Sequence, residues 1–109
     1  MAKYSLRFFF DPGAGVCLWA GNDAAKERFE YAVDLSQLPL PENSRRRALH
    51  VCYWYDTCID WNRPSGQSPW DAAERNRFNV EAQKLLSMLR EQLGPNFEIV
   101  DESGIREEH

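Results

Sequence analysis

The chain has 109 residues, of which 43% are hydrophobic, so it fits one domain whose core needs no disulfide staples. Its 17 acidic and 13 basic residues leave a net charge of −4, which disfavours a nucleic-acid partner because phosphate binding needs a cationic face. No stretch approaches the ~20 apolar residues of a membrane span, no signal peptide opens the chain, and three cysteines do not suggest a disulfide framework, so we expect a cytoplasmic protein.

The first elements in the chain are predicted strands. Residues 3–10, "KYSLRFFF", alternate so that one face carries Tyr4, Leu6, Phe8 and Phe10. The turn-forming "DPGAG" (11–15) separates this run from a second apolar run at 16–20. Together they predict a β-hairpin with a five-residue loop.

The next segment predicts a short helix and then an extended connector. Residues 21–31 are compatible with a helix capped by Asn22 or Asp23, because both side chains can accept from free backbone amides. Residues 32–41 contain two prolines, which prevent a regular helix through this stretch. We therefore expect an extended connector over these residues.

A first long helix is predicted over 42–60, although its segment "CYWYDTCIDW" is rich in strand-forming residues. Its hydrophobic period is helical, with a polar stripe on one side. The predicted buried face consists of Ala48, Leu49, Val51, Cys52, Tyr55 and Ile59.

A loop is predicted over 61–70, followed by a second long helix. Ser68 fits the N-cap, Pro69 the first helical position and Asp71 the end of a capping box. Gly94 and the following proline would end this helix. Its predicted apolar stripe comprises Phe78, Ala82, Leu85, Leu86, Leu89 and Leu93.

A third strand is predicted over 96–101, which gives an α+β fold. We expect a small antiparallel sheet, formed by the N-terminal hairpin and this C-terminal strand, with two long antiparallel helices packed on one face. Residues 1–101 would form a single domain. Residues 102–109 would be a charged, frayed tail.

The sequence offers weak candidates for catalysis or metal binding. Cys52 and Cys58 lie six residues apart, about 9 Å of helix rise, and His50 is about two turns from Cys58. Structural zinc needs four convergent ligands, and the remaining histidine, His109, lies on the tail. We therefore predict no catalytic residue, no metal and no cofactor. Asp56 is expected to be a partly buried carboxylate bonded to a loop amide or to an arginine such as Arg63.

The aromatic excess is the remaining feature. Trp54 and Trp61 lie seven residues apart, on a flank of the first long helix that is not its main buried face. Either the 61–70 loop covers this flank in a cluster that includes Trp70, or one or more of the rings stay exposed. Exposed rings rimmed by charges would form a protein-binding hot spot. Its predicted residues are Tyr53, Trp54, Asp60, Trp61 and Arg63, with Asp56 in support.

Four stretches carry a resemblance to known sequences. Residues 17–40, 54–61, 68–86 and 93–101 resemble a group of small bacterial proteins that carry no known catalytic motif. In size, charge and style the chain is similar to the immunity proteins of polymorphic toxin systems. That resemblance implies a protein that binds and blocks a cognate toxin, and it assigns no binding residues.

Three functions therefore stay open. The first is a non-enzymatic, immunity-type inhibitor, a monomer or weak homodimer, whose acidic surface occludes a basic toxin domain. The second is a small-molecule binder or enzyme with a pocket between sheet and helices, lined by Trp19, Tyr55 and Asp56. The third is a subunit that self-associates through the same aromatic surface or a sheet edge.

Overall fold

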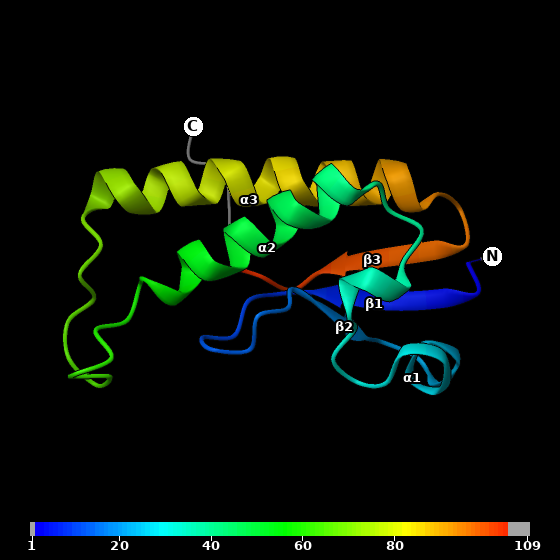
Figure 1. Cartoon of the computed structure of the whole chain (residues 1–109), viewed down its shortest axis with the longest axis horizontal. Helices are drawn as coiled ribbons and strands as arrows, with labels where there is room; N and C mark the ends of the chain where they lie inside the picture. The colour runs from blue at the N-terminus through cyan, green and yellow to red at the C-terminus, as the bar shows by residue number, and fades with distance from the viewer. Residues whose placement is uncertain (1, 105–109) are drawn as a thin grey trace.

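The computed structural model describes residues 2–104, which form a three-stranded sheet with helices along it (Figure 1). Of the predicted tail, residues 105–109, including His109, lie outside the described residues. Glu102 belongs to the described part, where its backbone amide donates to the carbonyl of Phe8 at 2.9 Å. The elements in chain order are β1 Tyr4–Phe8, β2 Leu18–Ala20, α1 Asp23–Phe29, the 3₁₀ helix η1 Leu35–Gln37, α2 Glu42–Asp56, α3 Ala72–Leu93 and β3 Phe97–Asp101.

The sheet has the order β2-β1-β3, with β1 in the centre. β1 and β2 form the predicted antiparallel hairpin, in which Leu6 lies opposite Ala20. β3 runs parallel to β1, with Ile99 opposite Leu6, so the prediction of a purely antiparallel sheet is wrong. The reason is α3, whose 22 residues span about 33 Å and return the chain to the end of the sheet where β1 begins.

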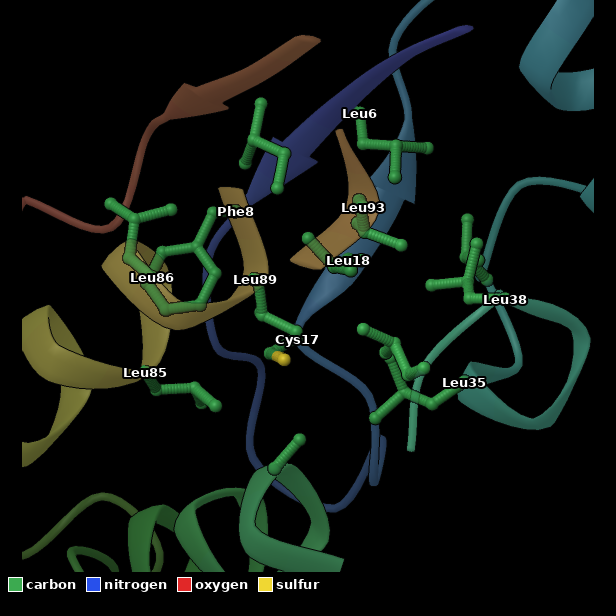
Figure 2. Close-up of a cluster of buried hydrophobic side chains, with 14 of the residues drawn as sticks. Leu6, Phe8, Cys17, Leu18, Leu35, Leu38, Leu85, Leu86, Leu89 and Leu93 are labelled. Atoms are coloured by element: carbon green, nitrogen blue, oxygen red, sulfur yellow. The ribbon is translucent and has the colours of Figure 1, made fainter. Parts of the chain in front are cut away.

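The core fills the space between one face of this sheet and the helices. Leu6, Phe8 and Leu18 point from the sheet toward leucines of α3, as Figure 2 shows. The whole predicted stripe of α3 is buried, which confirms the second long helix. Cys17 and the connector leucines Leu35 and Leu38 close the other side of this cluster.

The opposite face of the sheet carries Trp19. Because side chains alternate along a strand, Trp19 points away from Leu18 and lies next to Arg7 on the outer face. There its ring stacks on Phe9, with ring centroids 4.7 Å apart, and its indole N–H donates to the Phe9 carbonyl. Trp19 therefore cannot line a pocket between sheet and helices, which corrects that part of the small-molecule hypothesis.

The two long helices run in opposite directions. Arg47 of α2 pairs with Glu81 of α3 at 3.2 Å, and farther along, Trp54 Nε1 donates to Glu74 Oε1 at 3.1 Å. Figure 1 shows that the helices are inclined to one another rather than strictly aligned. The α+β fold with two long helices is therefore confirmed, but the helices are not strictly antiparallel.

Helix α2 ends at Asp56, four residues earlier than predicted. The Thr57 hydroxyl donates to the Trp54 carbonyl and ends the last turn. Ile59 consequently leaves the helix and is only half-buried. Leu49 is 38% exposed, because the buried stripe of Ser44, Ala48, Val51 and Cys52 is narrow and Leu49 lies about 100° around the helix from Ala48.

Helix α3 begins three residues later than predicted, because Asp71 rather than Ser68 is its N-cap. The Asp71 carboxylate accepts the Glu74 backbone N–H at 2.7 Å. Ser68 instead donates its hydroxyl proton to the Cys58 carbonyl and accepts the Trp70 backbone N–H. Ser68 thus shapes the loop before the helix, and Pro69 lies outside the helix.

Candidate functional site: the end of helix α2

The predicted binding residues lie at the C-terminal end of α2 and in the loop that follows it. We call Tyr53, Trp54, Asp56, Asp60, Trp61 and Arg63 the α2-end surface. Tyr53 is 60% exposed and Trp61 is 57% exposed, which is unusual for such large rings. Two aromatic side chains therefore stand in solvent at this end of the molecule.

Asp56 connects the end of α2 to both the β1–β2 loop and Trp61. Its carboxylate accepts the backbone N–H of Gly13 at 2.8 Å, and its carbonyl accepts the indole N–H of Trp61 at 3.1 Å. A Cβ added to Gly13 would lie 3.4 Å from the Trp61 ring, so ring and loop are in contact. The loop-amide partner predicted for Asp56 is confirmed, and it belongs to the β1–β2 loop.

Trp54 lies in a different environment from Trp61. It is half-buried, with its ring edge-to-face on Phe78 at 5.3 Å between centroids and tilted against Trp70 at 6.3 Å. Its indole N–H is satisfied by Glu74. The predicted tryptophan cluster therefore forms from Trp54 and Trp70, while Trp61 stays exposed.

Asp60 and Arg63 lie on a tight local turn. The Asp60 carboxylate accepts the Asn62 backbone N–H at 3.0 Å, and its carbonyl accepts the Arg63 N–H at 2.8 Å. Both side chains are exposed. This turn exposes one negative and one positive side chain within two residues of Trp61 in the sequence.

The α2-end surface falls into two groups. Tyr53 and Trp54 border a shallow depression of about 520 Å³ with His50, Thr57 and Glu74. Trp61 instead rests against the β1–β2 loop through Asp56. The end of α2 thus lies between the Tyr53–Trp54 depression and the Trp61 ring. A single partner could cover both.

A second feature was predicted only in part. Of the three residues expected to line a pocket between sheet and helices, Tyr55 lines the pocket found here, whereas Trp19 and Asp56 do not. An aromatic pocket of about 260 Å³ opens between the end of α2, α3 and the chain after β1. Its lining includes Phe10, Tyr55, Trp70, Phe78, Arg75 and Asn79. The aromatic excess was visible in the sequence, but Phe10 and Phe78 are 68 positions apart, and only the fold brings their rings to 5.2 Å.

Cys58 also lines this pocket, and its environment bears on nucleophilic chemistry. Burial raises the pKa of the Cys58 thiol, and the nearby Asp56 carboxylate raises that pKa further. A thiol with a raised pKa is protonated at neutral pH and is a weak nucleophile. The pocket therefore does not prepare Cys58 for covalent catalysis.

The described residues hold no cluster of metal-ligating side chains and no membrane-spanning helix. Within residues 2–104, histidine, cysteine and acidic side chains do not gather in threes as a metal site requires. None of the helices in the described part of the chain combines the length and apolar character needed to cross a membrane.

The fold and the site define an α+β protein with exposed aromatic side chains beside acidic groups, which are features of a protein-binding surface. The family model described as Serratia CdiI immunity protein-like matches residues 7–102, so the chain belongs to this family. The resemblance to immunity proteins of polymorphic toxin systems is thereby confirmed. A comparison with curated proteins gives no match.

Proposed function

We propose that this chain is a cytoplasmic immunity protein that binds a contact-dependent inhibition toxin and blocks it by occlusion, without catalysing a reaction. The observation that carries this proposal is the family match over residues 7–102. The exposed rings of Tyr53 and Trp61 support a docking role for the α2-end surface.

Trp61 is suited to be an anchor because it is both exposed and held in place. Its indole N–H is bonded to the Asp56 carbonyl, and its ring touches the loop at Gly13. A side chain that is already ordered loses less conformational entropy when it binds. Large rings presented in this way often contribute most of the affinity of an interface.

Charge favours a basic partner. The protein carries a net charge of −4. On the α2-end surface the exposed Asp60 is balanced by Arg63, and Glu74 at its border is paired with Arg77 at 3.0 Å. Complementary charge raises the association rate and orients the encounter, and both effects weaken with salt. The net charge of the whole chain therefore suits a basic toxin domain better than an acidic one.

The test needs the cognate toxin domain, which is to be sought in the reading frame next to this gene in its native genome. We expect the double variant Tyr53→Ala/Trp61→Ala to bind that domain at least about tenfold more weakly in calorimetric titration, since each ring is a potential hot spot. The variant should also fail to protect cells that express the toxin. Its melting temperature should change little, because both rings are exposed.

Tyr31→Ala is the matched control, because Tyr31 is 50% exposed but packs beside Trp19 on the outer sheet face. The proposed surface is wrong if the double variant binds as tightly as this control. The proposed function itself fails if the wild-type chain neither binds nor neutralises the toxin.

Self-association is measured on the same variants. If two copies pair through Tyr53 and Trp61, size-exclusion chromatography at rising concentration should show a dimer for the wild type and none for the double variant. Concentration-independent elution of the wild type as a monomer would leave the surface available to the toxin.

A further inference from the structure

The aromatic pocket has the size of a site for one side chain. Its volume of about 260 Å³ is below the range of roughly 300–1,000 Å³ typical of sites for drug-sized ligands. Tyr55 stacks on Phe10 with ring centroids 5.2 Å apart, and the centroids of Trp70 and Phe78 are 5.0 Å apart. These rings hold one another in place, so the walls of the pocket are ordered before a partner binds.

Arg75 gives this lining its charge. Of the lining residues within 2–104, Arg75 alone is charged, and its side chain is exposed. In the same part of the chain it pairs with neither a carboxylate nor an aromatic ring, whereas Arg77, two positions later, is bonded to Glu74 at 3.0 Å. The pocket therefore offers an incoming group both aromatic walls and a guanidinium that has no ion-pair partner among the described residues.

These two features together select the chemistry of the occupant. A cationic side chain would be attracted by the ring faces but repelled by Arg75. A carboxylate would pair with Arg75 but would lie against ring faces, which carry negative partial charge. An aromatic side chain satisfies both features, because rings pack edge-to-face or offset on one another and a guanidinium binds over a ring face.

The pocket is continuous with the α2-end surface. Tyr53 and Trp54 border a depression that shares Thr57 and Glu74 with a second depression of about 290 Å³. Trp70 lines both this second depression and the aromatic pocket. A protein docked on Tyr53 therefore reaches the aromatic pocket by extending across the Trp70 ring.

We propose that the aromatic pocket receives an aromatic side chain of the toxin, whose ring packs against the walls and contacts the guanidinium of Arg75. This inference rests on the proposed function, because it takes the bound protein to be the toxin. It names the chemistry of one anchor on the partner, which the family match does not specify.

Filling the pocket tests whether it is occupied. Asn79 lines the pocket and is half-buried, whereas Asn76, three positions earlier on α3, is exposed and outside the lining. We expect Asn79→Phe to weaken toxin binding at least about tenfold in calorimetric titration, because its own ring takes the place of the toxin's. Asn76→Phe should leave the affinity unchanged. Circular dichroism melting checks that both variants fold.

Removing the cation tests its contact with the occupant. Arg75→Gln and Lys26→Gln each remove one positive charge from an exposed position, but Lys26 lies on α1, outside the pocket lining. We expect Arg75→Gln to weaken toxin binding about fivefold, because the toxin ring loses its cation. Lys26→Gln should not weaken binding, because it only makes the net charge more negative.

Alanine scanning of the toxin identifies the chemistry of the occupant. Aromatic, acidic and basic toxin residues are replaced one at a time, and each variant is titrated against the wild-type chain, Asn79→Phe and Arg75→Gln. We expect one aromatic replacement to weaken binding at least about tenfold to the wild-type chain and clearly less to Asn79→Phe, where the pocket is already filled. Replacements of acidic and basic toxin residues should be additive with both variants.

The outcomes separate this inference from the proposed function. If the wild-type chain binds the toxin but Asn79→Phe binds as tightly as Asn76→Phe, the pocket inference is overturned and the proposed function stands. Coupling of Asn79→Phe or Arg75→Gln to an acidic or basic toxin residue, in place of an aromatic one, also overturns the inference. If Asn79→Phe does not fold, the coupling between Arg75→Gln and the aromatic toxin residues decides alone.

Discussion

At the scale of single residues, the three cysteines differ in their access to solvent. Cys17 is fully buried and Cys52 is 3% exposed, while Cys58 is half-buried at the aromatic pocket. A hydrogen bond with Cys52, together with burial, raises the pKa of the Cys17 thiol well above its usual value. Buried thiols of this kind behave as small hydrophobic groups.

This arrangement predicts how the thiols react with an alkylating reagent. In the folded chain we expect slow reaction of Cys58 alone, and reaction of all 3 cysteines in denaturant. Because the pKa of Cys58 is raised, its thiolate fraction at pH 8 is smaller than that of a free thiol, and its rate should keep rising above pH 9. Mass spectrometry of quenched samples measures this, and Cys58→Ser is the control. Rapid labelling of Cys17 would contradict the packing.

The two aspartates around the end of α2 have different structural roles. Asp56 joins the helix to the β1–β2 loop, whereas the Asp60 carboxylate accepts the Asn62 backbone N–H within its own turn. The sequence predicted the need of Asp56 for a donor, because a carboxylate near the core edge must be satisfied. It could not identify Gly13, because that contact spans 43 positions.

We therefore predict that Asp56→Ala lowers the free energy of unfolding by about 1 kcal/mol, the usual value of one hydrogen bond. Asp60→Ala should change it by less than about 0.5 kcal/mol, as for most surface substitutions. Urea denaturation followed by circular dichroism measures both values. Equal values for the two variants would show that the loop contact contributes nothing.

At the scale of secondary-structure elements, the sequence predicted both long helices. It placed the end of α2 too late and the start of α3 too early. Ser68 and Asp71 are both good capping residues, so local preference could not choose between them. Tertiary contacts decided the start of α3, because Ser68 is engaged with the Cys58 carbonyl and the Trp70 ring packs on Phe78.

The cap of α3 gives a direct test at this scale. Asp71→Ala should lower the free energy of unfolding by about 1 kcal/mol, because the Glu74 backbone N–H loses its acceptor. Asp71→Asn should retain most of that stability, since an amide oxygen can still accept. Chemical denaturation of the two variants and the wild type measures these free energies of unfolding. If Asp71→Ala is neutral, the helix is capped elsewhere.

The direction of β3 also belongs to this scale. Alternation in residues 96–101 predicted a strand, but alternation is the same for a parallel and an antiparallel neighbour. The choice was made by the length and inclination of α3, which returns the chain beside the start of β1, where the Tyr4 N–H bonds to the Asn96 carbonyl.

At the scale of the whole molecule, Phe78 joins segments that are distant in the sequence. Its ring is 2% exposed and lies within 5.0–5.5 Å of four other aromatic rings, those of Phe10, Trp54, Tyr55 and Trp70. These rings come from the chain after β1, from α2, and from the loop before α3. Phe78 therefore supports both the core and the aromatic pocket.

Removing this ring should affect the entire fold. We predict that Phe78→Ala lowers the free energy of unfolding by about 3–5 kcal/mol, a large part of the total for a domain of this size. Val80→Ala, two positions along α3 and 49% exposed, should cost less than about 1 kcal/mol. Thermal and urea denaturation compare the two. A small loss for Phe78→Ala would mean that the aromatic cluster is not central to stability.

The sequence by itself determined what depends on local pattern: the strands and helices, the buried stripe of α3, the acidic character and the kinship with immunity proteins. The tertiary structure decided which face Trp19 occupies, which tryptophan stays in solvent, the direction of β3 and the existence of the aromatic pocket. Periodicity and capping act over a few residues, so a sequence reports them directly. A pocket or an exposed ring depends on contacts between distant segments, which form only when the helices settle on the sheet.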